Sequence, residues 1–177
     1  LKIKYKKILF SNNFFSKYLC KNKNYIYNFL LYGFKINKLQ VFKKYDLIFY
    51  IKKHQNKRNE FLIKLIERLS DKYTICVLGE KIIFKKNVFN VGFVSKKKAI
   101  TYIKQSRAAV SSPENLFSFF LLDCISNKLV VFYNKNYNPK KNILTNLLVP
   151  INFNNYKTSI SIIKNILSKK INKNIFL

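Results

Sequence analysis

The sequence predicts an α/β fold in which a parallel β-sheet is covered by helices on both faces. From residue 45 onward, apolar runs of strand length alternate with stretches of about ten residues whose apolar side chains recur at helical spacing. Hydrophobic residues make up 49% of the chain, which is enough to build a core. The chain has only three glycines, and each follows a predicted strand, where a turn or a close approach to a ligand requires one.

The first quarter of the chain is expected to belong to a different unit. The pattern predicts a short strand, a helix, a second strand and a closing glycine, at 7–11, 14–20, 25–32 and Gly33. Residues 34–44 are basic and irregular, which indicates a linker. We therefore expect one domain to end within residues 1–44 and a second domain to occupy residues 45–177.

The second domain has the regular pattern. Strands are predicted at 46–51, 73–78, 88–91, 108–111, 129–133 and 149–152. Helices are predicted at 58–69, 95–105, 117–125, 140–147 and 158–167. Ser95 is a suitable cap for the helix that begins there, because a serine hydroxyl accepts a hydrogen bond from a free backbone N–H group. Strands joined by helical crossovers pair in parallel, so helices are expected on both faces of the sheet.

The formal charge of +28 is compatible with two interpretations. Clustered lysines would suit a nucleic-acid binder, because they neutralise phosphates. The other interpretation is coding bias, since Lys, Asn, Ile, Phe, Tyr and Leu dominate while Gly, Pro and Trp are scarce or absent. The lysines are spread along the whole chain, which favours bias over a nucleic-acid function. In either case the charge would attract the protein to anionic membrane surfaces.

Cysteine usage and hydropathy suggest a cytoplasmic protein. The three cysteines, Cys20, Cys76 and Cys124, are scattered and form no zinc or disulfide pattern, so no metal and no cofactor is expected. No apolar run approaches the roughly 18 residues needed to span a bilayer. The chain begins at Leu1 and not at methionine, which suggests a fragment or a processed product.

The loop after the first strand of the second domain is a candidate phosphate site. Lys52 and Lys57 lie five residues apart, between the end of a strand and the start of a helix. Two cations beside the free amides of a helix amino terminus suit a diphosphate, although pairs of lysines are common in this chain. The single histidine, His54, lies in the same polar loop, where a solvent-facing role is favoured over catalysis because no nucleophile is placed near it.

A second candidate site lies around residues 111–124. Only seven acidic residues occur in the chain, and Glu114 and Asp123 flank a loop and an apolar helix there. A carboxylate at a strand-to-helix loop can accept hydrogen bonds from sugar hydroxyls, and one on the inner face of the helix can hold a ribose. Helix capping for Glu114 and a surface position for Asp123 are the structural alternatives.

Taken in order, these segments resemble the C-terminal domain of GT-B glycosyltransferases, in the large retaining group that uses nucleotide-sugars. The resemblance covers about residues 45–135 and implies a Rossmann-like sheet. YDLIFYIKKHQNKRNEFLIKLIERL is similar to the family's first strand, Gly-Arg…Lys-Gly loop and helix, with Lys52 at the arginine and Lys57 at the lysine. TICVLGE is similar to the next strand, and NVFNVGFVSKKKAITYIKQS to the segment whose backbone lies against the base, at Gly92. SSPENLFSFFLLDCISNKLVVFYN is similar to the signature in which two glutamates flank a glycine-rich loop.

The chain departs from the family pattern at several positions. Lys52 replaces an arginine and cannot form a bidentate pair. The glycines of the signature are replaced by Asn115, Leu116 and Ser118. Asp123 replaces the second glutamate and falls one residue late, so that Leu122 occupies the strict position. Either an inserted loop residue restores Asp123 to the site, or the ribose contact is lost.

The resemblance implies binding of a nucleotide-sugar donor for glycosyl transfer to a glycan or lipid acceptor. The implied donor-binding residues are Lys52, Lys57, Gly92, Glu114, Asn115, Ser118 and Asp123. The family's acceptor domain and catalytic histidine lie in its N-terminal half, and residues 5–44 resemble only the last strand, helix and crossing linker of that half. The isolated chain is therefore expected to be inactive. The alternatives are a basic α/β nucleic-acid-binding protein and a degenerate, non-catalytic relative.

Overall fold

The computed structural model consists of two compact units, one formed by Leu1–Ile36 and the other by Asn37–Leu177. It describes residues 8–10, 26–28, 42–53, 59–84, 87–113, 118–137 and 147–168. In the first unit, β1 (Ile8–Phe10) pairs in parallel with β2 (Ile26–Asn28), within the two strands predicted there. The helix expected at 14–20 and Gly33 lie outside the described residues, as does most of the predicted linker.

The second unit contains a six-stranded sheet in which every pair of neighbouring strands is parallel. Its strands are β3 (Tyr45–Ile51), β4 (Ile75–Gly79), β5 (Val88–Gly92), β6 (Ser106–Val110), β7 (Val130–Asn134) and β8 (Leu148–Ile151). Their order across the sheet is β5-β4-β3-β6-β7-β8. The described helices are α2 (Glu60–Leu69), α3 (Lys96–Lys104), α4 (Phe119–Ser126) and α5 (Tyr156–Ser168). The prediction of a parallel sheet is confirmed, and the helix expected at 140–147 falls almost wholly outside the described residues.

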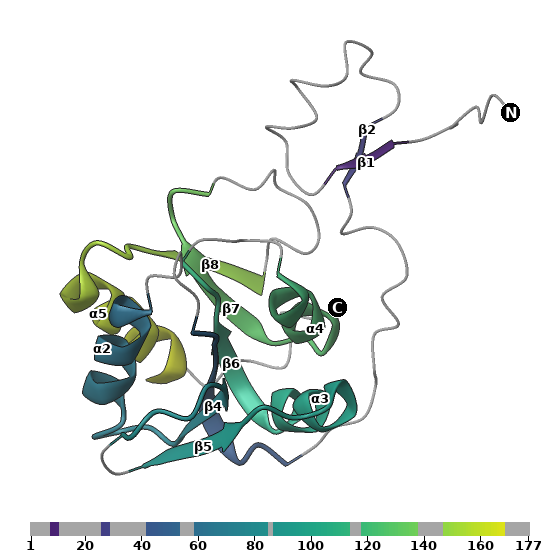
Figure 1. Ribbon diagram of the computed structural model, residues 1–177. Helices are drawn as coiled ribbons and strands as arrows, with labels where there is room; N and C mark the ends of the chain where they lie inside the picture. Colours follow the sequence, from purple (N-terminus) through teal and green to yellow (C-terminus); the bar gives the residue numbers. More distant parts are fainter. Residues whose placement is uncertain are drawn as a thin grey trace, which may run out of the picture. The chain divides into compact units, whose positions relative to one another are not determined.

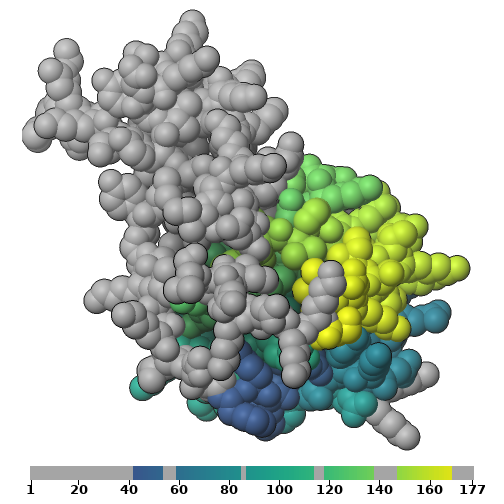
Figure 2. Space-filling view, turned by 180° about the vertical axis from the view of Figure 1, so that it is seen from behind, coloured from purple at the N-terminus to yellow at the C-terminus, as the bar shows by residue number. Residues whose placement is uncertain are grey.

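Helices cover both faces of this sheet (Figure 1). α2 and α5 contact each other on one face, and α3 and α4 contact each other on the other. Seen from behind, the yellow surface of α5 lies beside the blue surface of α2 (Figure 2). The expected doubly covered sheet is therefore the fold of residues 45–168 wherever the structure describes them.

The larger part of the core lies between the sheet and the α2–α5 layer. The apolar spacing of α2 turns one stripe inward, and that stripe packs on alternate residues of the strands. The fully buried members from the sheet and from the two helices are Leu47, Phe49, Ile75, Val77, Ala108, Phe132, Leu62, Leu65, Ile66, Leu69 and Ile163. No glycine or charged residue is among these buried side chains.

One polar cluster joins the amino-terminal ends of the strands. The Arg107 guanidinium of β6 donates one hydrogen bond to Asp46 of β3 at 2.8 Å and another to the carbonyl of Leu167 in α5 at 2.8 Å. The second oxygen of Asp46 accepts a hydrogen bond from the backbone N–H of Thr74, just before β4, at 3.0 Å. This cluster connects β3, β6, the residue before β4 and the end of α5. It lies at the end of the sheet where the parallel strands begin.

Candidate functional site

The strand order places a topological switch point at the carboxyl ends of β3 and β6. The chain proceeds outward from β3 to β4 and β5, and then returns to form β6 on the other side of β3. The connection leaving β3 leads to α2 on one face, whereas the connection leaving β6 leads to α4 on the opposite face. In open parallel sheets, ligands bind at the point where two neighbouring connections diverge in this way.

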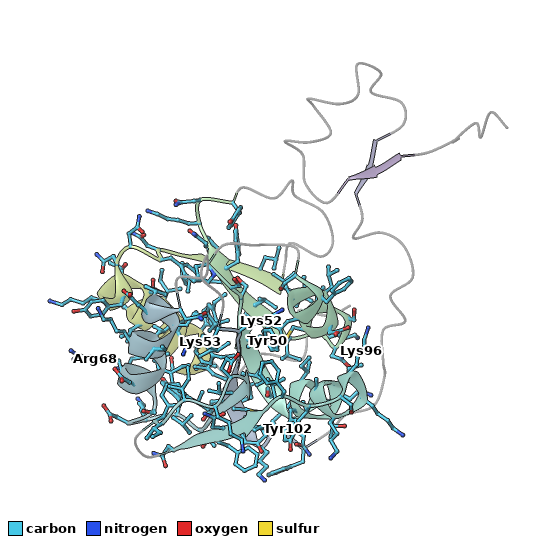
Figure 3. All side chains as sticks on the ribbon, viewed as in Figure 1. Tyr50, Lys52, Lys53, Arg68, Lys96 and Tyr102 are labelled. Carbon is cyan, nitrogen blue, oxygen red and sulfur yellow. The ribbon has the colours of Figure 1, made fainter. Side chains whose placement is uncertain are left out.

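The loop after β3 brings cations to this switch point. Lys52 and Lys53 follow the last residue of β3, and both are exposed. The side-chain amide of Asn59, just before α2, donates a hydrogen bond to the Lys52 carbonyl at 3.0 Å, which ties the loop back to the helix. Neither ammonium forms an ion pair with any of the described residues. Figure 3 shows both lysines near Tyr50, between the two helix layers. Lys57 and His54 lie outside the described residues.

The loop after β6 is held close to the ends of its neighbours. Ser111 is fully buried, and its N–H donates to the carbonyl of Phe132 in β7 at 2.9 Å. The amide of Asn134, the last residue of β7, donates to the Pro113 carbonyl at 3.2 Å. These bonds fix the path of the chain up to residue 113. Glu114 and Asn115 follow, outside the described residues, so their predicted roles stay predictions.

The start of α4 is fixed by a cap and by an aromatic contact. The Ser118 hydroxyl oxygen accepts a hydrogen bond from the N–H of Leu121 at 3.2 Å, which makes Ser118 the helix cap. Its hydroxyl proton stays available for a ligand. Phe120 stacks on Tyr50, the penultimate residue of β3, with ring centroids 5.8 Å apart. The stack joins the β3 end to α4, and no local sequence signal could have indicated a contact over 70 residues of chain.

Asp123 lies on α4 and faces the first turn of α3. Its carboxylate is 3.9 Å from the ammonium of Lys96, and its side chain is 24% exposed. Burial raises the pKa of Asp123, and the nearby Lys96 ammonium opposes part of that rise. Leu122, at the strict family position, is buried in the core. Of the two neighbours, Asp123 is thus the one whose side chain a polar ligand could reach.

Gly79 and Gly92 are the last residues of β4 and β5, at the end of the sheet where the parallel strands terminate. Both have a positive φ. At Gly79, with φ +97°, an added Cβ would overlap the carbonyl oxygen of Ile51 at the end of β3. That oxygen accepts a hydrogen bond from the N–H of Glu80 at 2.8 Å, so Gly79 permits the close approach of two strand ends. At Gly92, with φ +78°, the nearest atoms belong to the flexible side chain of Lys81. Gly92 is itself buried, and only this movable side chain lies against the position of an added Cβ.

The described residues at this end of the sheet offer ammonium groups, hydroxyls, backbone amides and carboxylates as binding groups. Burial raises the pKa of the Cys76 thiol to about 12 and raises that of Cys124 well above its usual value. Neither thiol therefore forms a thiolate at neutral pH. Within the described ranges, no group of three His, Cys, Asp or Glu side chains comes together as a metal site.

No protein-family model matches the sequence, and no curated protein matches it either. Solved structures do match. TarM is matched with a TM-score of 0.56 at 16% identity, over 75% of this chain and 30% of TarM. The C-terminal domain of LpcC, a glycosyl transferase group 1 family protein from Francisella tularensis, is matched with a TM-score of 0.53 at 18% identity, over 81% of this chain and 92% of that domain.

A DNA-modifying β-glucosyltransferase is matched with a TM-score of 0.54 at 14% identity, over 87% of this chain and 51% of the enzyme. The chain thus spans about a third of TarM and half of the β-glucosyltransferase, but nearly all of the isolated LpcC domain. The chain has the Rossmann-like fold of the C-terminal half of GT-B glycosyltransferases, as the resemblance in sequence predicted.

Proposed function

We propose that this fold serves here to bind a nucleotide-sugar, as the donor-binding domain of a glycosyltransferase that acts on a glycan or lipid acceptor. The observation that carries the proposal is the placement of Lys52 at the switch point between β3 and β6, with no internal ion-pair partner among the described residues. The matched β-glucosyltransferase takes uridine diphosphoglucose as its substrate, which is a ligand of this class.

The donor diphosphate is assigned to the loop after β3. Lys52, together with Lys57, supplies positive charge, and the amino terminus of α2 supplies amides and the positive end of its dipole. Lys52 carries a single ammonium group on a flexible side chain, where the family has the planar guanidinium group of an arginine. We therefore expect Lys52 to contact one phosphate oxygen at a time.

The nucleoside and the sugar are assigned to the other side of the switch point. The base would lie against the backbone at Gly92, and Asp123 would accept hydrogen bonds from the ribose. Glu114, Asn115 and the Ser118 hydroxyl would hold the sugar. Lys96 already contacts Asp123, so a bound ribose would share that carboxylate with the lysine.

The isolated chain is expected to bind the donor without turning it over, because the acceptor site and catalytic base of the proposed enzyme would come from another domain. We further propose a cytoplasmic protein in peripheral contact with an anionic membrane, which the charge of +28 supports. Among the described residues, no helix is both long and apolar enough to cross a membrane.

Calorimetric titration with UDP, ADP and GDP, with and without an attached glucose, tests donor binding. Hydrogen bonds to charged groups contribute about 1.5–3 kcal/mol, so Lys52→Ala should weaken diphosphate binding about 10-fold to 150-fold. Lys53→Ala is the matched control, because Lys53 is the adjacent exposed lysine. Equal losses in the two variants would indicate diffuse attraction and not a site. Absence of binding by the wild type at millimolar ligand would mean that the donor-site assignment is wrong or that the site has decayed.

The high charge keeps one competing function open, a basic α/β protein that binds nucleic acid. Binding to DNA or RNA that falls steeply with salt, together with no affinity for any nucleotide-sugar, would favour that function.

A further inference from the structure

α3 carries an unbalanced charge. Four of its nine residues are lysines, and none is acidic. α2, on the opposite face of the sheet, contains Glu60, Lys64, Glu67 and Arg68, whose charges cancel. Figure 3 shows Lys96 on α3 and Arg68 on α2 on opposite sides of the sheet. The excess charge of α3 is therefore concentrated on one side of this unit.

The lysines of α3 stand where helix stability disfavours them. Ser95 is the N-cap, and Lys96, Lys97 and Lys98 are the first three residues of the helix, all exposed. The amino terminus of a helix carries a partial positive charge and unpaired N–H groups, so carboxylates are stabilising there and ammonium groups are not. Only Lys104, in the last turn, is favourably placed. The helix dipole therefore gives no reason for the three first-turn lysines, and of the three only Lys96 has an ion-pair partner among the described residues, Asp123.

An exposed aromatic side chain precedes these lysines. Phe93, in the turn between β5 and α3, is 63% exposed. Phe89, also partly exposed on β5, packs against Tyr45 and Tyr102 at centroid distances of 5.7 and 6.2 Å. Phe93 makes no such ring contact with any of the described aromatic residues. An exposed apolar side chain thus lies three to five residues before the three exposed lysines of the helix start.

We infer that Phe93, Lys96, Lys97 and Lys98, here termed the α3 face, dock on an anionic lipid bilayer. Lysines beside a membrane are attracted to acidic headgroups, and an apolar side chain placed among them can enter the boundary between headgroups and acyl chains. Electrostatic attraction and apolar insertion are the two signals that stable peripheral binding needs.

Two features of the α3 face favour a bilayer over nucleic acid. Its cations are all lysines, and no arginine, the residue that most often reads guanine edges, lies between Asn87 and Gln105. Phenylalanine also lacks the hydrogen-bonding groups that would reward contact with base edges. The inference rests on the membrane contact proposed above, and the α3 face shares only Lys96 with the proposed donor site.

The test compares two double charge reversals in the full chain. K97E/K98E changes the α3 face, and K157E/K164E makes the same change in net charge at two exposed lysines of α5. Binding is measured by sedimentation with vesicles of equimolar phosphatidylcholine and phosphatidylserine. Each lysine near an anionic surface strengthens binding about fivefold, so K97E/K98E should weaken binding at least about 30-fold. K157E/K164E should change it within about threefold, because distant charges are screened.

A second pair of variants tests the aromatic contact. Phe93→Ser should weaken vesicle binding about 10-fold or more, because the burial of one apolar side chain is lost. Phe119→Ser is the matched control, since Phe119 is another exposed phenylalanine, 76% exposed, on α4.

The melting temperature of K97E/K98E is the control for folding. Glutamates in the first turn of α3 should favour the helix, so this temperature should not fall. Lost vesicle binding cannot then be attributed to unfolding.

The outcomes separate the two proposals. Failure of the wild type to bind these vesicles overturns both the membrane contact and its location. Equal losses of vesicle binding in K97E/K98E and K157E/K164E overturn the assignment of the contact to the α3 face. They would show that the whole positive charge of the protein attracts it to the membrane. Loss of binding to mixed-sequence double-stranded DNA in K97E/K98E, with vesicle binding unchanged, would assign the α3 face to nucleic acid. Donor titration of the same variants is expected to be unaffected, so a failed donor site is recognised independently.

Discussion

At the scale of single residues, Gly79 is the described glycine at which an added Cβ has the least room. Gly79→Ala places a Cβ against the Ile51 carbonyl oxygen. It also forces an alanine into a positive φ, which side chains with a Cβ disfavour. A strained backbone conformation costs about 1–3 kcal/mol, and the overlap adds to it, so we expect a loss of at least about 2 kcal/mol in the free energy of unfolding. Urea denaturation measures this loss.

Gly92→Ala is the control for that substitution. Its φ is also positive, but the added Cβ meets only the flexible Lys81 side chain, with the nearest atom at 3.1 Å. The expected cost is about 1 kcal/mol, from the backbone conformation alone. A Gly92 variant less stable than the Gly79 variant would show that the strand ends pack differently.

Asp123 predicts a dependence of stability on pH. Burial raises its pKa in the folded protein, so the folded state retains the proton to higher pH than the unfolded state does. The contribution of this carboxyl to stability is therefore lost as pH rises through the folded pKa. Asp123→Asn replaces the carboxyl group by an amide, which does not titrate in this pH range. The stability of the variant relative to the wild type should rise between pH 3 and pH 7, as measured by urea denaturation across that range. A constant or falling difference would contradict the raised pKa.

Some site residues could be predicted from sequence and others could not. The position of Lys52 could be predicted because it directly follows an apolar strand, and the structure places it just after β3, while its role in donor binding stays a prediction. The Tyr50–Phe120 stack and the Lys96–Asp123 pair were not, because each joins residues far apart in the chain. Such contacts follow from the strand order, on which local patterns carry no information.

At the scale of elements, the amino terminus of α3 offers a simple test of helix energetics. K98E places a carboxylate three residues after Ser95, where it can accept a hydrogen bond from the Ser95 N–H while Ser95 caps the helix. We expect an increase of about 0.3–1 kcal/mol in the free energy of unfolding. K104E reverses a favourable charge in the last turn and should lower stability by a similar amount. Thermal melts of both variants measure the two signs, and equal signs would contradict the dipole account.

Element boundaries were predicted well where apolar side chains define them and poorly where polar residues enter a strand. β6 begins at Ser106, two residues before the predicted start, because the Ser106 hydroxyl donates to the Tyr102 carbonyl and Arg107 pairs with Asp46. Conversely, β4 begins at Ile75, although the pattern predicted a strand from Tyr73. Tyr73 is buried in the core without being part of the strand, so its apolar character is misleading.

At the scale of the whole unit, the Arg107 cluster connects elements that the sequence separates widely. Arg107→Met keeps the apolar stem but removes both hydrogen bonds, and leaves Asp46 partly buried without its cation. We expect a loss of about 2 kcal/mol in the free energy of unfolding. Arg107→Lys should recover about half of it, because an ammonium lacks the fork that reaches both partners. Full recovery in the lysine variant would show that charge alone matters.

The position of β3 also determines when this unit can form during synthesis. Leu47 of β3 pairs with Ala108 of β6, about 60 residues later in the chain. At translation rates of 5–20 residues per second, about 3–12 s pass between the synthesis of β3 and that of β6, its second neighbour in the sheet. During that interval an apolar strand with one unpaired edge is exposed on the nascent chain, which is the kind of segment that chaperones recognise and that aggregates when they are absent.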